Sequence, residues 1–285
     1  MWAPAVVWAR PQRLFFRRTT ASSIVLPLDQ VTSATAGLSV ARKLRAAYSG
    51  SCIRIRRASD DTETDIGFGT ATSDGVPIDS AAIATFCSGT TGYIRWIYDQ
   101  SGNSNDVGQA TTTSQPIIYQ SGAVVTGANG RVACVFDGTD DSLIRGSMSY
   151  GSEYASYSTI KPVSGSSSNV MLHFGSNQRT ALRRGTTNWF INNSASFDTG
   201  VVLTDGTWVH VAVGGNTGGD ESFSLNGATA STGTAGNNTA NSIGIGLGSS
   251  TCAFQFHEHL IYNAAYNGTH NTTLFSNADA FYAIP

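Results

Sequence analysis

Residues 205–227 read DGTWVHVAVGGNTGGDESFSLNG, and this stretch decides the fold. An apolar run led by Trp208 is followed by a glycine-rich turn and a second apolar run that ends on Asn226-Gly227. That dipeptide favours a type I′ hairpin, because both central residues of such a turn need positive φ. The stretch therefore predicts two strands and the hairpin that follows them.

Similar short apolar runs lie on both sides of this stretch, separated by Gly, Ser, Asn and Asp. We expect strands at 52–56, 93–98, 132–136, 157–161, 170–174, 189–192, 243–245 and 254–262. Short strands with turn residues between them are typical of a β-sandwich. Few helices are expected: one at 33–48 from the spacing of its apolar residues, one capped by Asp79, and one from Asn267 to about Tyr282.

The composition excludes several classes of protein. Only 13% of the residues are charged and the formal net charge is −2, so no basic field is present to hold nucleic acid or an anionic membrane surface. No stretch approaches the roughly 20 apolar residues that a membrane-spanning helix needs. Four widely spaced cysteines (Cys52, Cys87, Cys134 and Cys252) predict buried thiols instead of a zinc site or a disulfide framework.

The first 30 residues form a region apart from the predicted domain, which we place at 31–285. Apolar and basic side chains are interleaved here, and the residues expected to anchor the chain are Trp2, Trp8, Phe15, Phe16, Arg17 and Arg18. Prolines and arginines interrupt the apolar run, so it is a poor signal peptide. Three interpretations stay open: an arm that docks into an assembly, an ordinary edge strand of the domain, or, less favoured because Pro4 and Pro11 would interrupt it, a helix on a membrane surface.

Three further segments carry a resemblance to a known family. They are 42–67, 79–103 with its YDQSG loop, and 135–141, which reads VFDGTDD. In this order they resemble the catalytic domain of the fungal-type α-L-arabinofuranosidase B, and they are similar to phage and bacterial proteins with laminin-G-like jelly rolls. The 205–227 stretch resembles the strand pair of concanavalin-like and laminin-G domains. The resemblance implies an all-β, concanavalin-like (laminin-G-like) jelly-roll sandwich with a few short helices.

The resemblance also allows the enzyme hypothesis to be tested, because a retaining glycosidase needs two carboxyl groups. Where the family is expected to carry its nucleophilic Glu, this chain has Gln178 within FGSNQ. Where the acid/base Asp is expected, it has Gly248 after IGIGL. Neither residue ionises. Both catalytic carboxylates are therefore predicted to be lost, and no catalytic residue is assigned.

Other carboxylates could replace them, since position in space and not in sequence defines a glycosidase pair. The candidates are Glu153, Asp198, Asp205, Asp220, Glu221 and Glu258. Glu258 lies between His257 and His259 in a predicted strand, where alternation puts the two histidines on one face and the glutamate on the other. We expect a hydrogen-bonded strand face there instead of a metal site.

Several residues are candidates for contact with a sugar. Asp99, Gln100 and Asn103 of the YDQSG loop can hydrogen-bond a sugar or, alternatively, satisfy backbone groups inside the loop. Trp96 and Trp189 suit the apolar face of a pyranose if they are exposed. No cofactor is expected, although Asp137, Asp140 and Asp141 leave a structural calcium ion possible; turn chemistry is the favoured explanation of these residues.

These observations predict a phage virion protein, such as a tail, fibre or capsid-decoration component, made in the host cytoplasm and incorporated into the particle. Its partners would be other virion proteins and host surface glycans, with no nucleic acid and no membrane insertion, and it would form a homo-oligomer. The alternatives are a glycoside hydrolase with a rearranged site and a free carbohydrate-binding lectin.

Overall fold

The computed structural model describes residues 25–146, 148, 153–164, 170–173, 180–193, 195–236, 242–246 and 252–284. These residues include three α-helices: α1 (Pro27–Gln30), α2 (Ser80–Phe86) and α3 (Gly268–Tyr282); short 3-10 turns occupy Thr112–Ser114 and Ala128–Gly130. None of the described helices is long and apolar enough to cross a membrane. The anchoring residues predicted between Trp2 and Arg18 lie outside the described part of the chain.

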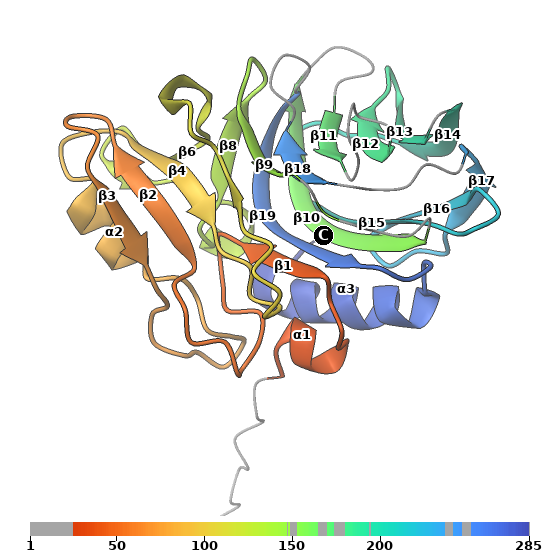
Figure 1. Ribbon diagram of the computed structural model, residues 1–285, viewed down its shortest axis with the longest axis horizontal. Helices are drawn as coiled ribbons and strands as arrows, with labels where there is room; N and C mark the ends of the chain where they lie inside the picture. Colours follow the sequence, from red (N-terminus) through yellow and green to blue (C-terminus); the bar gives the residue numbers. More distant parts are fainter. Residues whose placement is uncertain are drawn as a thin grey trace, which may run out of the picture.

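The strands form two packed layers, and α3 covers the outer side of the first (Figure 1). The first layer comprises β1 (Ala36–Ser39), β8 (Cys134–Asp137), β10 (Tyr154–Ser164), β15 (Val209–Gly215), β16 (Asp220–Leu225), β17 (Ser231–Thr234) and β19 (Ala253–Tyr262). The second comprises β9 (Ser142–Arg145), β11 (Val170–His173), β12 (Thr180–Arg184), β13 (Asn188–Asn193), β14 (Ala195–Val202) and β18 (Ile243–Gly246).

Six shorter strands join the two layers at one end. They are β2 (Ile53–Arg57), β3 (Glu63–Ile66), β4 (Gly92–Ile97), β5 (Val107–Gly108), β6 (Ile117–Gln120) and β7 (Ala123–Val124). β4 pairs with β5, which pairs with β9 of the second layer, and also with β6, which pairs with β8 of the first. All pairings are antiparallel and the sheet nearly closes on itself. The predicted all-β jelly-roll sandwich with a few short helices is confirmed.

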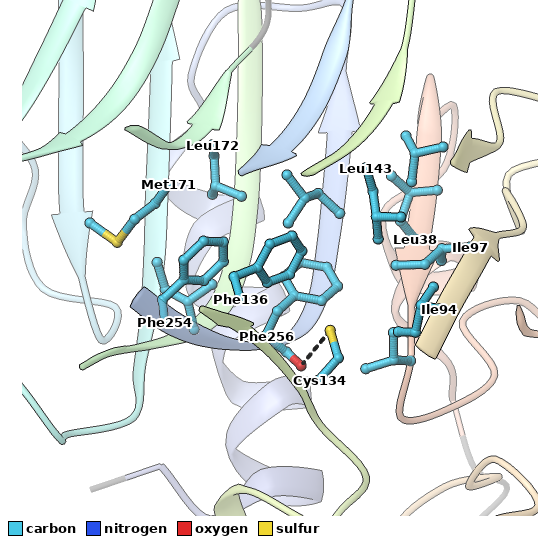
Figure 2. Close-up of a cluster of buried hydrophobic side chains, with 14 of the residues drawn as sticks. Leu38, Ile94, Ile97, Cys134, Phe136, Leu143, Met171, Leu172, Phe254 and Phe256 are labelled. Carbon is cyan, nitrogen blue, oxygen red and sulfur yellow. Dashed lines mark hydrogen bonds between the residues drawn. The ribbon is translucent and has the colours of Figure 1, made fainter. Parts of the chain in front are cut away.

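The main core lies between the layers and contains stacked aromatic rings. Phe136 of β8 and Phe254 of β19 have ring centroids 4.4 Å apart, and Phe256 meets Phe136 edge-on at 6.5 Å (Figure 2). Met171 and Leu172 reach this cluster from the second layer. All four cysteines are buried and unbonded to one another, as predicted.

A second core lies under α1 and α3, on the outer face of the first layer. It includes Leu28, Leu44, Tyr157, Leu260 and Leu274. Leu26, Pro27 and Leu28 are buried, so this part of the segment that the sequence prediction assigned to the arm packs against the domain.

The helix predicted at 33–48 was wrong. Ser33 has a φ of +66°, and Ala36–Ser39 form β1, which pairs antiparallel with β19 from Ile261 to Glu258. All four β1 residues are buried. The apolar spacing was real, but pairing with a long neighbouring strand buries these residues more completely than one helical face would.

Candidate functional site

The YDQSG loop is held by its own side chains. The Asp99 carboxylate accepts hydrogen bonds from the backbone N–H groups of Gly37 (2.8 Å), Ser101 (2.8 Å) and Asn105 (3.0 Å). Gln100 accepts from the N–H of Leu44 at 2.7 Å. Both side chains are buried, because each satisfies backbone groups of the loop or of a neighbouring segment. Of the two interpretations for Asp99 and Gln100, the structural one holds, and neither side chain faces solvent where a sugar could bind.

Asn103 is different, because it is exposed beside a pocket. Its amide nitrogen donates to the carbonyl oxygens of Ala34 (2.9 Å) and Thr35 (3.2 Å). The pocket has a volume of about 400 Å³ and is lined by Leu28, Asp29, Thr32, Ser33, Ala34, Arg45, Ser101 and Asn103. Asn103 therefore remains a candidate ligand-binding residue, and the pocket beside it is polar.

The two candidate tryptophans have opposite surroundings. Trp189 is 1% exposed and packs in the main core against Phe223, with ring centroids 5.9 Å apart, so its prediction as an exposed sugar platform was wrong. The alternating pattern of β13 points residue 189 inward. Trp96 is half-buried: it lies against Gly108, and the guanidinium of Arg95 sits 5.0 Å from the ring centroid.

Polar side chains occur inside the sandwich near the centre of both layers. Ser158 Oγ of β10 lies 2.6 Å from His259 Nδ1 of β19. Burial lowers the pKa of His259 to about 3, and the neighbouring His173 of β11 acts in the same direction. His259 is therefore neutral at physiological pH.

Glu221 of β16 is the second polar feature of the interior. Its carboxylate accepts hydrogen bonds from the Tyr154 hydroxyl (2.6 Å) and from the Asn193 amide of the opposite layer (2.6 Å). Burial raises the pKa of Glu221 to about 7, although both hydrogen bonds act to lower it. This glutamate links the two layers, and its side chain is fully enclosed.

Glu258 lies on the other face of the first layer, under α3. The Arg42 guanidinium donates two hydrogen bonds of 2.8 Å to its carboxylate, and the Tyr282 hydroxyl of α3 donates a third at 2.8 Å. The two charged side chains are each 2% exposed. Although burial acts to lower it, the pKa of the Arg42 guanidinium is raised by the adjacent Glu258 carboxylate. The cluster ties the end of β1 to β19 and α3.

The predicted faces of the HEH triplet were wrong because β19 contains a bulge. The register with β10 shifts between Thr159↔Glu258 and Ile160↔Phe256, which leaves His257 as an extra residue. His257 therefore shares the outer face with Glu258 and stacks on Trp208 at 3.9 Å, while His259 points inward. The two histidines therefore lie on opposite faces and do not converge.

The acidic turn after β8 brings three carboxylates together. One oxygen from each of Asp137, Asp140 and Asp141 lies within 4.8 Å of the others. Asp141 accepts from the N–H of Asp137 (2.9 Å), and Asp137 accepts from the N–H of Thr139 (2.7 Å), as turn chemistry predicts. Burial raises the pKa of Asp141 to about 7. The oxygen donors suit calcium, which stays the alternative to the favoured explanation by turn chemistry.

Comparison with known proteins identifies the family. Residues 29–171 match the family model of the catalytic domain of α-L-arabinofuranosidase B, which is 143 of the 285 residues and just over half of the chain. The chain belongs to this arabinofuranosidase B family.

Family relatives are similar over limited lengths. α-L-Arabinofuranosidase B of Emericella nidulans is 44% identical over 79 residues, which is 28% of this chain and 15% of that protein, and the Aspergillus niger enzyme gives the same figures. The chain thus matches only a small part of these curated relatives. A solved GH54 α-L-arabinofuranosidase soaked with a cyclic sulfate inhibitor superposes with a TM-score of 0.69 at 21% identity, over 87% of this chain and 63% of that one. An arabinofuranosidase in complex with arabinofuranosyl-α-1,2-xylobiose gives 0.66 at 20%. At this identity the superpositions show the fold alone.

The arabinofuranosidase B match ends at residue 171, before both positions where catalytic carboxylates were predicted to be lost. Gln178 and Gly248 lie outside the described residues, so their assignment stays a prediction. The described strands that precede them, β11 and β18, pair antiparallel with His173 opposite Gly244.

Proposed function

We propose that this arabinofuranosidase-family domain recognises carbohydrate without hydrolysing it, and that it is carried as a structural component of a phage virion. The position of the two buried glutamates is the observation that supports the absence of hydrolysis. Glu221 faces the interior of the sandwich with Asn193 and Tyr154, whereas Glu258 faces α3 with Arg42 and Tyr282.

Two carboxyl groups in one chain do not by themselves make a glycosidase. The two groups must flank the same glycosidic bond, and the distance between them is about 5–5.5 Å in retaining enzymes and about 6.5–9.5 Å in inverting ones. Glu221 and Glu258 lie on opposite faces of one sheet and are fully buried, so no sugar can lie between them. Of the other candidates, Asp205 is paired with Arg184, and Asp198 accepts from Asn188 at 3.0 Å.

Carbohydrate recognition is supported by family membership and by the polar pockets of the surface. Asn103 lines the pocket beside the YDQSG loop, and Trp96 retains an accessible part. The virion role rests on the sequence resemblance to phage proteins with the same block order and on the apolar and basic arm that precedes the domain. A sandwich suits such a role, because a rigid core carries loops that can vary.

The test is a paired assay on the full chain. Hydrolysis of 4-nitrophenyl α-L-arabinofuranoside is measured beside a GH54 arabinofuranosidase as positive control, and binding is measured on an array of neutral and acidic glycans. We expect selective glycan binding with no release of nitrophenol above buffer. Release of nitrophenol above buffer would overturn the proposal in favour of a hydrolase with a rearranged site.

The virion role has its own measurement. Electron cryo-microscopy of phage particles from the source lysate should place this chain in ordered density, with the first residues against a neighbouring protein. A chain that binds glycans but is absent from particles would instead be a free lectin.

A further inference from the structure

A second pocket lies on the outer face of β12, β13 and β14, away from the loop described above. It has a volume of about 340 Å³, within the range of small-ligand sites, and is lined by Arg183, Arg184, Gly185, Thr186, Phe190, Asn192 and Ser196. No residue predicted from the sequence to contact a ligand lies in it.

Strand pairing explains why these side chains share a face. Arg183 is directly opposite Phe190, and Asn192 is directly opposite Ser196, so each pair projects from the same side of the sheet. The residues between them, Leu182 and Ile191, point into the main core. The pocket is therefore built on regular strands, which hold a site more rigidly than a loop does.

The aromatic ring of Phe190 forms one wall. It lies so close to Gly185 that a Cβ atom on that residue would come within 2.3 Å of the ring. Glycine at 185 thus allows the ring to pack directly against the backbone at the edge of the pocket. Phe190 remains partly exposed, and an aromatic face of this kind suits the apolar side of a pyranose ring.

Arg183 supplies charge at the other side. Arg184 is paired with Asp205 through two contacts, one of them 2.8 Å, which fixes its position. Arg183 is half-buried, and this burial lowers the pKa of its guanidinium. An arginine guanidinium presents several planar donors, and a carboxylate matches that geometry with two parallel hydrogen bonds.

We propose that this pocket binds a hexuronate residue of an acidic saccharide, with the sugar carboxylate on Arg183, the pyranose ring against Phe190, and Asn192 and Ser196 on its hydroxyl groups. The inference rests on the proposed carbohydrate recognition and names its ligand class. Asp198, opposite Phe190, projects from the same face, and its carboxylate accepts hydrogen bonds from the Asn188 amide (3.0 Å) and from the N–H of Gly200 (2.9 Å).

Isothermal titration calorimetry on the full chain tests this site. The probes are tri-galacturonate and a glucuronate-containing hyaluronan tetrasaccharide, with galactotriose as the neutral match. We expect an acidic probe to bind, the neutral probe to bind at least about tenfold more weakly, and the difference to shrink in high salt.

Variants locate the binding. Arg183→Ala should lower the affinity for the acidic probe by about tenfold or more, and Asn192→Ala should lower it by about threefold to tenfold. Arg57→Ala removes the same charge from β2, at the opposite end of the molecule from β12 (Figure 1), and should leave affinity unchanged. If Arg183→Ala does not fold, Asn192→Ala and the salt dependence decide.

Each outcome is decisive. Equal affinity for acidic and neutral probes, or acidic binding that both pocket variants retain, would overturn the inference while the proposed carbohydrate recognition stands. Array binding confined to neutral glycans would do the same. Absence of binding to every glycan would overturn both.

Discussion

Replacement of Arg42 by methionine tests whether the buried cluster under α3 holds the two halves of the chain together. The substitution keeps an apolar stem but leaves Glu258, which is about 1% exposed, with the hydrogen bond from the Tyr282 hydroxyl and no guanidinium beside it. Removing one partner of a buried ion pair typically costs about 3–5 kcal/mol, because the other charge stays buried without compensation. We expect Arg42→Met to lower the free energy of unfolding by that amount.

A surface pair with the same geometry provides the control. Arg54 donates hydrogen bonds of 2.7 and 2.9 Å to the Asp65 carboxylate, but both side chains are more than a third exposed. Exposed pairs contribute about 0–1 kcal/mol, so Arg54→Met should change stability little.

The assay is urea unfolding followed by tryptophan fluorescence, with the midpoint and slope compared between variants. Trp208 stacks on His257 beside the cluster and reports its integrity. The double variant Arg42→Met, Glu258→Leu should recover most of the loss, because no uncompensated charge is left. Equal losses at Arg42 and Arg54, or a loss below about 1 kcal/mol at Arg42, would refute the reasoning.

Three further predictions concern the interior and α3. A Cβ at Gly244 would lie 1.7 Å from His173 Nε2, so Gly244→Ala should destabilise the fold by about 1–3 kcal/mol or more, while Gly67→Ala, with open space around it, should be nearly neutral; thermal unfolding compares them. Glu221 has a folded pKa of about 7 against an ordinary value of 4.5, so it favours folding below about pH 4.5 and loses that contribution as pH rises through 7. Glu221→Gln should flatten the stability profile above pH 5, and an unchanged profile would contradict this. Asn267→Ala removes the acceptor for two N–H groups at the start of α3 and should cost about 1 kcal/mol in urea unfolding.

Elements governed by local chemistry were predictable from the sequence. Asn226 and Gly227 have φ values of +48° and +73°, as the predicted hairpin requires. Asp79 caps α2 by accepting from the N–H of Ala82, and Asn267 caps α3. In each case the residue that fixes the backbone is adjacent in sequence to the element it starts or turns.

The site was harder to predict than the fold, because burial is decided by distant segments. Asp99 and Gln100 have side chains typical of a ligand-binding loop, yet they bond to backbone groups more than 50 residues away in sequence. Trp189 has the residue type of a sugar platform but faces Phe223 of the opposite layer. The pocket around Arg183 and Phe190 was missed because its residues converge only through strand pairing, although alternation along 188–193 could have separated inner from outer side chains.

The bulge at His257 shows why strict alternation misassigned the HEH triplet and what the extra residue achieves. An unbroken strand would place Glu258 and His259 on opposite faces and His257 with His259, inside the sandwich. The register shift instead leaves His257 outside, where its Nδ1 lies 2.8 Å from the carbonyl oxygen of Val132 and its ring stacks between Trp208 and Tyr282. Burial lowers the pKa of His257 to about 3, so the ring stays neutral and can stack without a charge to solvate. The bulge thus allows β19 to present Glu258 to Arg42 and an aromatic ring to α3 from consecutive residues, which a regular strand cannot do.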